Sequence, residues 1–193
     1  MHSRLALLFA GALLTGCAQA AAQHFTGVAL PASPAPNFTL TSDSGIPWTL
    51  AAQHGKVVAL FFGFTHCTDT CPDTLAKLAN VLHQDKAGTR GEIAFVTIDP
   101  QRDTPAVLHK YIRRFSGAAI VGLTGTPAQI AAVEHAYNIW SKPVPDPHGG
   151  TDYDEEHSAF TFLIDRDGNW RVIHNDDDRQ RDFSADVQEL LQS

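Results

Sequence analysis

The sequence predicts an α/β fold in which helices cover both faces of a mostly parallel β-sheet. Two apolar runs, residues 56–64 and 92–99, have the composition of buried central strands. Segments with helical periodicity alternate with strand-like runs from residue 71 onward, which favours parallel pairing. An Asp-Gly pair at residues 167–168 predicts a hairpin near the C-terminus, which adds an antiparallel strand.

The first predicted element is a hairpin over residues 37–50, where two short β-like runs flank a Ser-Gly turn. A helix over residues 71–84 follows the first buried run, because Leu75, Leu78 and Leu82 recur on one helical face. The chain therefore passes directly from a buried strand into a helix at this point.

Two further helices begin at Thr-Pro pairs. Thr104 and Thr126 suit the N-cap, and the proline after each suits the first helical position. After the second buried run the predicted order is a helix at 103–115, a strand at 119–123, a helix at 126–137, a hairpin at 159–174 and a helix at 183–191. With the N-terminal hairpin as an extension, this order matches the thioredoxin fold.

The N-terminus predicts export and a lipid anchor. Arg4 precedes an apolar stretch of signal-peptide length that ends in the sequence LTGC. This ending resembles a bacterial lipoprotein signal, so residues 1–16 are expected to be removed and Cys17 to be lipidated. Residues 17–36 are rich in Ala and Pro and are expected to tether the domain, residues 37–193, to a membrane facing the periplasm or cell exterior. An ordinary cleaved signal or an uncleaved anchor is the alternative.

The charge balance argues against nucleic acid as a partner. Arg4 is the one Lys, Arg, Asp or Glu residue before Cys17, so the segment from Cys17 onward has a formal net charge of −8, against −7 for the whole chain. An acidic surface repels phosphate groups and anionic lipids. A basic or metal-bearing partner fits this charge.

Cys67 and Cys71 are the two thiols that remain if Cys17 is lipidated. In an exported protein such a close pair predicts a disulfide, a redox pair or a metal site. Pro72 suits the first helical position, which places Cys71 at the N-cap and Cys67 in the preceding loop. The helix dipole favours thiolates there, and thiolates are soft ligands suited to copper(I) or zinc.

His157 differs from the other nine histidines by its position just before the strand that starts near residue 159. In the thioredoxin fold, the loop entering this strand packs against the cysteine site and usually carries a cis-proline. No proline stands in the segment DEEHSAF, so we expect His157 to reach Cys67 and Cys71 as a third ligand. Two thiolates and one imidazole suit copper, and zinc with a bound water is also chemically allowed.

Three segments together resemble the Sco/SenC family of copper-site assembly proteins. They are GFTHCTDTCPDTL at residues 63–75, TIDPQRDTPAVLHKYI at 97–112 and DYDEEHSAFTFLIDRDG at 152–168. The similarity covers roughly residues 36–193 in family order. Asp69 matches an acidic residue common between the family's cysteines, whereas Thr68 stands where the family often has proline.

The resemblance implies that Cys67, Cys71 and His157 hold copper, as Cu(I) or Cu(II). It implies a metallochaperone for the copper A centre of cytochrome c oxidase. The implied partners are the oxidase subunit carrying that centre and other copper chaperones or thiol reductants. The alternative is a membrane-tethered thiol–disulfide reductase that maintains the target's cysteines, with Cys67 and Cys71 closing a redox disulfide.

Two weaker signals remain. Thr68, Cys71 and Pro72 reproduce part of a peroxiredoxin pattern, but Phe64 stands where that pattern needs proline, so a peroxidase is a minor alternative. The acidic stretch at residues 146–157 is expected either to guide docking to a basic partner or to be a solvated loop. The DPQRDTP segment predicts a strand-to-helix turn, without a chemical role.

Overall fold

The computed structural model describes residues 23–83, 90–145 and 153–193. The described part of the chain contains four α-helices and one short 3-10 helix at Leu50–Gln53. The α-helices are α1 (Thr70–His83), α2 (Pro105–Ile112), α3 (Pro127–Ala136) and α4 (Gln180–Gln192). Thr104 and Thr126 cap α2 and α3 through their side chains, as the Thr-Pro pairs predict.

One sheet of eight strands runs through the molecule in the order β1-β10-β9-β4-β5-β6-β2-β3. The parallel pairs are β4 with β5 and β5 with β6, and the other five neighbouring pairs in this sheet are antiparallel. The sheet is therefore parallel only at its centre, and the prediction of a mostly parallel sheet is wrong. The strands are β1 (Val28–Pro34), β2 (Thr39–Ser42), β3 (Pro47–Thr49), β4 (Val57–Gly63), β5 (Gly91–Thr97), β6 (Ile120–Thr124), β9 (Phe160–Ile164) and β10 (Asn169–Asn175). The predicted β2–β3 and β9–β10 hairpins are both present.

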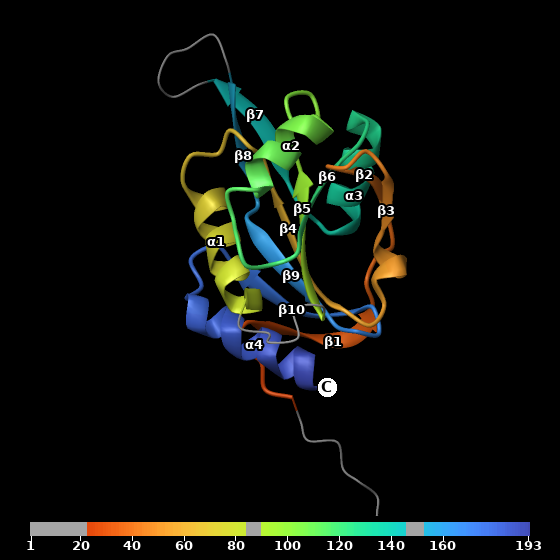
Figure 1. Cartoon of the computed structure of the whole chain (residues 1–193), viewed down its shortest axis with the longest axis vertical. Coiled ribbons are helices and arrows are strands. Elements are labelled where there is room, and N and C mark those ends of the chain that lie inside the picture. The colour runs from red at the N-terminus through yellow and green to blue at the C-terminus, as the bar shows by residue number, and fades with distance from the viewer. Residues whose placement is uncertain (1–22, 84–89, 146–152) are drawn as a thin grey trace, which may run out of the picture.

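Helices cover both faces of this sheet, as predicted. Figure 1 shows α1 and α4 together on one side and α3 on the other, and α1 contacts α4. The helix α2 lies on the same face of the sheet as α1. Tyr111 of α2 stacks on Phe95 of β5, and a Cβ at Gly63 of β4 would meet both the Phe95 ring and the sulfur of Cys71 in α1. On the opposite face, Phe62 contacts Tyr137 at the end of α3.

The core confirms the two strands predicted from apolar runs. Every residue of β4 and β5 is buried. Leu75 and Leu78 of α1 are fully buried against them, so the helical stripe read from the sequence faces the sheet. The α/β thioredoxin-like architecture with an N-terminal hairpin is therefore confirmed.

The strand β1 lies inside residues 17–36, the range predicted as a tether. It forms the sheet edge and pairs with β10 from Val28 to Pro34, so the ordered domain begins before residue 37. Proline is tolerated on an edge strand because its missing N–H can face away from the ladder. The predicted signal peptide and Cys17 lie outside the described residues.

A second difference is a two-stranded sheet formed by β7 (Ser141–Pro145) and β8 (Tyr153–His157). The sequence predicts a loop in this region, yet the chain forms a hairpin that projects from the end of the main sheet where α1 begins (Figure 1). The first described residues lie at the opposite end, near α4. Among the helices of the three described ranges, none has the length and apolarity needed to span a bilayer.

Candidate functional site

The two cysteines lie where β4 passes into α1. Cys67 is partly exposed in the turn before the helix, and Cys71 is fully buried in the helix's first turn. The helix begins at Thr70, one residue before the predicted N-cap Cys71. The backbone N–H of Cys71 donates to the sulfur of Cys67 at 3.3 Å, so Cys67 accepts a bond that a capping residue would accept. Both thiols are free.

His157 is the last residue of β8, and it lies beside the buried cysteine. Its Nε2 is 4.0 Å from Cys71 Sγ, and its ring packs edge-on against Phe64 at a centroid distance of 5.9 Å. The Nδ1 atom lies 3.1 Å from the carbonyl oxygen of Ser158, which can only accept. This contact assigns the proton of the neutral imidazole to Nδ1, which leaves a lone pair on Nε2 facing the sulfur.

This arrangement fits a soft metal ion, although it is not a closed cage. At the bond lengths of ~2.3 Å and ~2.1 Å typical of thiolate and imidazole ligands, two atoms on one ion lie at most about 4.4 Å apart. The 4.0 Å separation of Cys71 Sγ and His157 Nε2 meets that bound. In the described part of the chain, no three His, Cys, Asp or Glu side chains are already gathered at metal-binding distances. Cys67 would therefore complete the site by moving inward.

The two sulfurs differ in charge. A hydrogen bond from the Cys71 thiol lowers the pKa of Cys67 to about 6, and the backbone N–H groups of Cys71 and Asp69 add to that shift. The same bond and burial raise the pKa of Cys71 well above its usual range. At neutral pH the pair consists of an exposed thiolate at Cys67 and a buried thiol at Cys71. Burial also lowers the pKa of His157, which keeps its imidazole neutral and able to bind a metal.

A buried carboxylate fixes the turn that carries Cys67. Asp103, fully buried after β5, accepts from Thr65 N at 3.0 Å and from Thr65 Oγ1 at 2.5 Å. It also accepts from Thr97 Oγ1 at 2.7 Å. Burial raises the pKa of Asp103, while these donors oppose the shift. Asp103 thus ties the cysteine loop to the end of β5.

The same segment holds the hairpin that carries His157. Arg102 pairs with Asp99, lies 3.7 Å over the ring of Tyr153 and donates to the Tyr153 carbonyl at 2.8 Å. The Tyr153 hydroxyl donates to Asp99 at 2.8 Å. The DPQRDTP segment therefore contacts both sides of the site, a role missed in the sequence. The charged residues that directly follow a buried strand in this segment were the sequence feature that could have indicated this role.

A cavity of about 490 Å³ opens over the cysteine turn. Cys67, His157 and Trp140 all line it. Among the residues that the structure describes, its lining also holds five acidic side chains and no Lys or Arg; the five are Asp69, Asp154, Glu155, Glu156 and Asp176. Of the acidic stretch, Asp154 to Glu156 lie in β8 beside the cysteines, whereas Asp152 lies outside the described residues.

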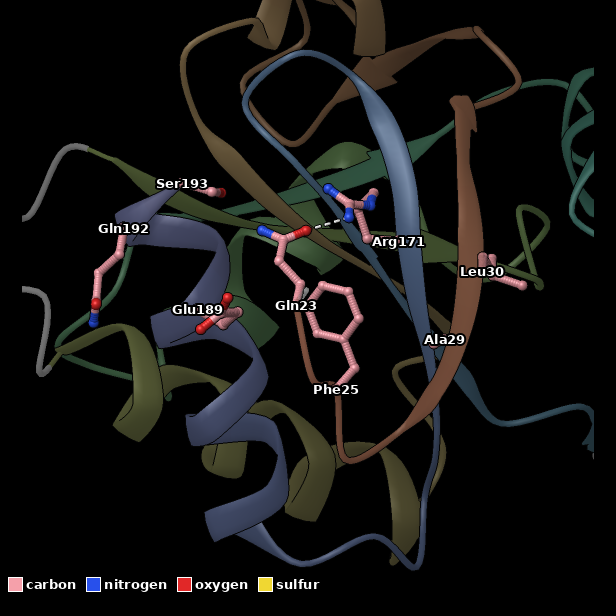
Figure 2. A pocket seen from close by; sticks show the side chains of 8 residues that line it. All are labelled: Gln23, Phe25, Ala29, Leu30, Arg171, Glu189, Gln192 and Ser193. Carbon is pink, nitrogen blue, oxygen red and sulfur yellow. Dashed lines mark hydrogen bonds between the residues drawn. The ribbon is translucent and has the colours of Figure 1, made fainter. Parts of the chain in front are cut away.

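A larger cavity of about 570 Å³ lies away from these residues, between the N-terminal segment, β10 and α4. Figure 2 shows Phe25 and Gln23 on one side and Glu189 of α4 on another, with Arg171 paired to Gln23. None of the predicted copper ligands lines this larger cavity, so the volume of a cavity does not identify the functional site in this protein.

The remaining described histidines are not near the cysteine pair, apart from His66 in the same turn. His174 is fully buried between two carboxylates, Asp178 at 2.7 Å and Asp186 at 3.0 Å. His109 pairs with Asp43 on the surface at 2.8 Å. Both histidines therefore make structural contacts away from the candidate site.

Comparison with known proteins gives a family match. The model of the SCO1/SenC family matches residues 28–192 of the chain. Among curated proteins, mitochondrial protein SCO2 of Saccharomyces cerevisiae is 39% identical over 133 residues, which are 68% of this chain and 44% of that protein. The chain spans about half the length of the first curated relatives it matches.

Solved structures agree with this result. ScoI of Bradyrhizobium japonicum, solved with copper bound, is 34% identical with a TM-score of 0.73, and the match covers 82% of this chain and 100% of that one. Yeast Sco1 with copper bound is 32% identical with a TM-score of 0.72, covering 83% and 90%. These two likenesses extend over most of the described domain.

Proposed function

Because the chain belongs to the SCO1/SenC family, we propose that it is a copper metallochaperone that holds the ion through Cys67, Cys71 and His157. The observation that carries this proposal is the 4.0 Å approach of His157 Nε2 to Cys71 Sγ across 86 positions of sequence. Related structures that contain copper support copper over zinc. Its target is the copper A centre of cytochrome c oxidase, as the sequence resemblance implies.

The three side chains have different tasks in this proposal. Cys67 is the accessible thiolate and makes the first bond to incoming copper. Cys71 loses its proton when it binds, because a coordinating thiol is deprotonated. His157 supplies neutral imidazole, oriented by its Nδ1 contact with the Ser158 carbonyl. Soft thiolates stabilise Cu(I), and the imidazole helps hold Cu(II).

The experiment is a copper titration of reduced protein comprising residues 23–193. Wild type is expected to bind one copper per chain, and Cys67→Ala and Cys71→Ala are each expected to abolish tight binding. His157→Ala is expected to lower the affinity by about 10–100-fold or more, since it removes a ligand. His66→Ala, at an exposed residue beside Cys67, is the matched control and should bind as wild type does.

Thiol–disulfide exchange is the second candidate, favoured by two free thiols and by the depressed pKa of Cys67. It makes no use of His157. If His157→Ala retains wild-type copper affinity and retains thiol exchange, the reductase function replaces the metallochaperone.

We also propose that the protein is exported and anchored through lipidated Cys17, with its domain facing the periplasm or cell exterior. Metabolic labelling with a fatty acid tests this directly. Label is expected in the wild-type chain and absent from Cys17→Ser. Equal labelling of the two would contradict the anchor.

A further inference from the structure

Trp140 is an exposed aromatic side chain at the edge of the cavity above the cysteines. More than half of it, 54%, is accessible to solvent, although large aromatic side chains bury 150–250 Å² each when they find a partner. It is one of four large hydrophobic side chains described as exposed, and the one of these that lines this cavity.

Hydrogen bonds hold the backbone segment that carries this indole. The backbone carbonyl of Trp140 accepts from Ser158 N at 2.8 Å, and the backbone N–H of Trp140 donates to Ser158 Oγ at 3.2 Å. Ser158 is also the residue whose carbonyl contacts His157 Nδ1. The backbone of Trp140 is therefore fixed relative to His157, so binding a partner costs little backbone entropy at this position.

The rest of the cavity is strongly acidic. Its five acidic side chains face no Lys or Arg among the described lining residues, although burial raises the pKa of Glu155 to about 7, so that four of the five are fully charged at neutral pH. Glu156 is exposed and lies opposite Lys142 in the β7–β8 register, whereas Asp69 lies within the cysteine turn itself. A polypeptide that reaches Cys67 must enter the negative electrostatic potential of these acidic side chains. Basic side chains on that polypeptide would be attracted and acidic ones repelled.

We propose that Trp140 and this acidic cavity form the docking surface for a partner polypeptide with basic residues beside its metal-receiving cysteines. The indole packs against the partner's backbone and the stems of its basic side chains, whose cationic heads lie near the ring and the carboxylates. This inference rests on the proposed function and names the partner class of the same site.

Copper transfer across this surface is a ligand exchange without electron transfer. Each bond that Cu(I) forms to a partner sulfur replaces one to Cys67, Cys71 or His157. When two partner thiols bind, each loses a proton; the released Cys71 thiolate takes up one of these protons and the solvent takes up the other. Docking therefore changes the rate of exchange but leaves the affinity of this protein for copper unchanged.

The test measures binding of a synthetic peptide with two cysteines spaced by three residues and flanked by lysines. A version with serine in place of both cysteines isolates docking from metal exchange. Trp140→Ala is expected to weaken binding of this serine peptide by about tenfold, and Trp140→Phe by much less. Ile46→Ala, at an exposed hydrophobic residue of the β2–β3 turn, is the matched control and should bind as wild type does.

The contribution of the acidic side chains to docking is tested with a second variant and its control. Glu156→Gln is expected to weaken binding of the lysine peptide at low salt and to have little effect at high salt. Glu189→Gln, in the cavity of Figure 2, should change nothing. The proposal is overturned if Trp140→Ala binds the peptide as wild type does, or if a glutamate-flanked peptide binds equally well. Because this readout needs no copper, failure of the copper titration would be a separate result.

Discussion

At the scale of single residues, the cysteine pair works because its members are unequal. Cys67 is partly exposed and accepts hydrogen bonds, so its charge is stabilised. Cys71 is buried and donates, so it stays protonated until a metal or an oxidant removes its proton. At neutral pH the Cys67 sulfur is therefore a reactive thiolate, whereas the Cys71 sulfur is an unreactive buried thiol.

The first prediction concerns the pH dependence of this pair. The pKa of Cys67 is depressed from 9.0 to about 6, so its thiolate fraction rises with pH through about 6. Alkylation of Cys67 by iodoacetamide in Cys17-free protein is expected to reach its half-maximal rate near pH 6. Cys71→Ala removes the thiol donor, so the midpoint of Cys67 should move upward toward 9.0. A wild-type midpoint near 9 would show that the hydrogen bond is absent.

The same shift makes a contribution to stability with a defined sign. The folded pKa of Cys67 lies below the unfolded value, so the thiolate stabilises the fold near and above pH 9. This contribution is lost as the pH falls through about 6. The difference in free energy of unfolding between reduced wild type and Cys67→Ala should therefore shrink from pH 8 to pH 5, as measured by urea unfolding.

Asp103 is a positioning residue for the site. Asp103→Ala leaves buried Thr97 Oγ1 and the Thr65 donors without their acceptor, which costs ~1–3 kcal/mol in unfolding free energy. Copper affinity is expected to fall by about tenfold or more because the Cys67 turn loosens. Urea unfolding and copper titration measure the two effects. Asp167→Asn, on the exposed β9–β10 turn, is the control.

At the scale of elements, the positions of helices and buried strands could be predicted because their signals are local. Apolar runs gave β4 and β5, and Thr-Pro pairs gave the starts of α2 and α3. The strand β1 could not be predicted, since its proline- and alanine-rich sequence becomes a strand only by pairing with β10, over 130 residues away. Tertiary pairing overrides propensity there.

The β7–β8 hairpin was missed for the same reason. Its strands hold Pro143, Pro145 and several acidic residues, which favour loops. Contacts from Asp99 and Arg102 to Tyr153 hold it to the domain. The place of His157 could be predicted from fold order, but the network that positions it could not, because it depends on these long-range contacts.

This attachment of the hairpin gives an element-scale prediction. Tyr153→Ala removes the ring under Arg102 and the hydroxyl bond to Asp99. Amide hydrogen exchange in β8 is expected to speed up, and copper affinity to fall, while protection of β4 and β5 is unchanged. Val107→Ala, an exposed residue of α2, is the control. Unchanged exchange in β8 would show that other contacts hold the hairpin.

At the scale of the whole molecule, the candidate site and the start of the domain lie at opposite ends (Figure 1). Asp186 of α4 holds the entering chain, accepting from Thr26 N at 2.8 Å and Gly27 N at 2.9 Å. Gly27 is needed there, because a Cβ would come within 2.9 Å of His174 and closer still to Val172.

His174 lies between Asp178 and Asp186 and joins β10 to α4 beneath the entering chain. His174→Ala is expected to lower the free energy of unfolding by ~1–3 kcal/mol, because it removes one buried partner of Asp186, which still accepts from Thr26 N and Gly27 N. Thermal unfolding measures the loss. Copper stoichiometry of the folded variant should stay at one, since the site is at the far end. A stability within 1 kcal/mol of wild type would contradict this role.

The most direct test of the central claim is X-ray absorption spectroscopy of the reduced protein loaded with one equivalent of Cu(I). Two sulfur ligands and one imidazole nitrogen are predicted, with the nitrogen lost in His157→Ala and a sulfur lost in each of Cys67→Ala and Cys71→Ala. A spectrum that lacks sulfur, or one that His157→Ala leaves unchanged, would contradict the three-ligand copper site.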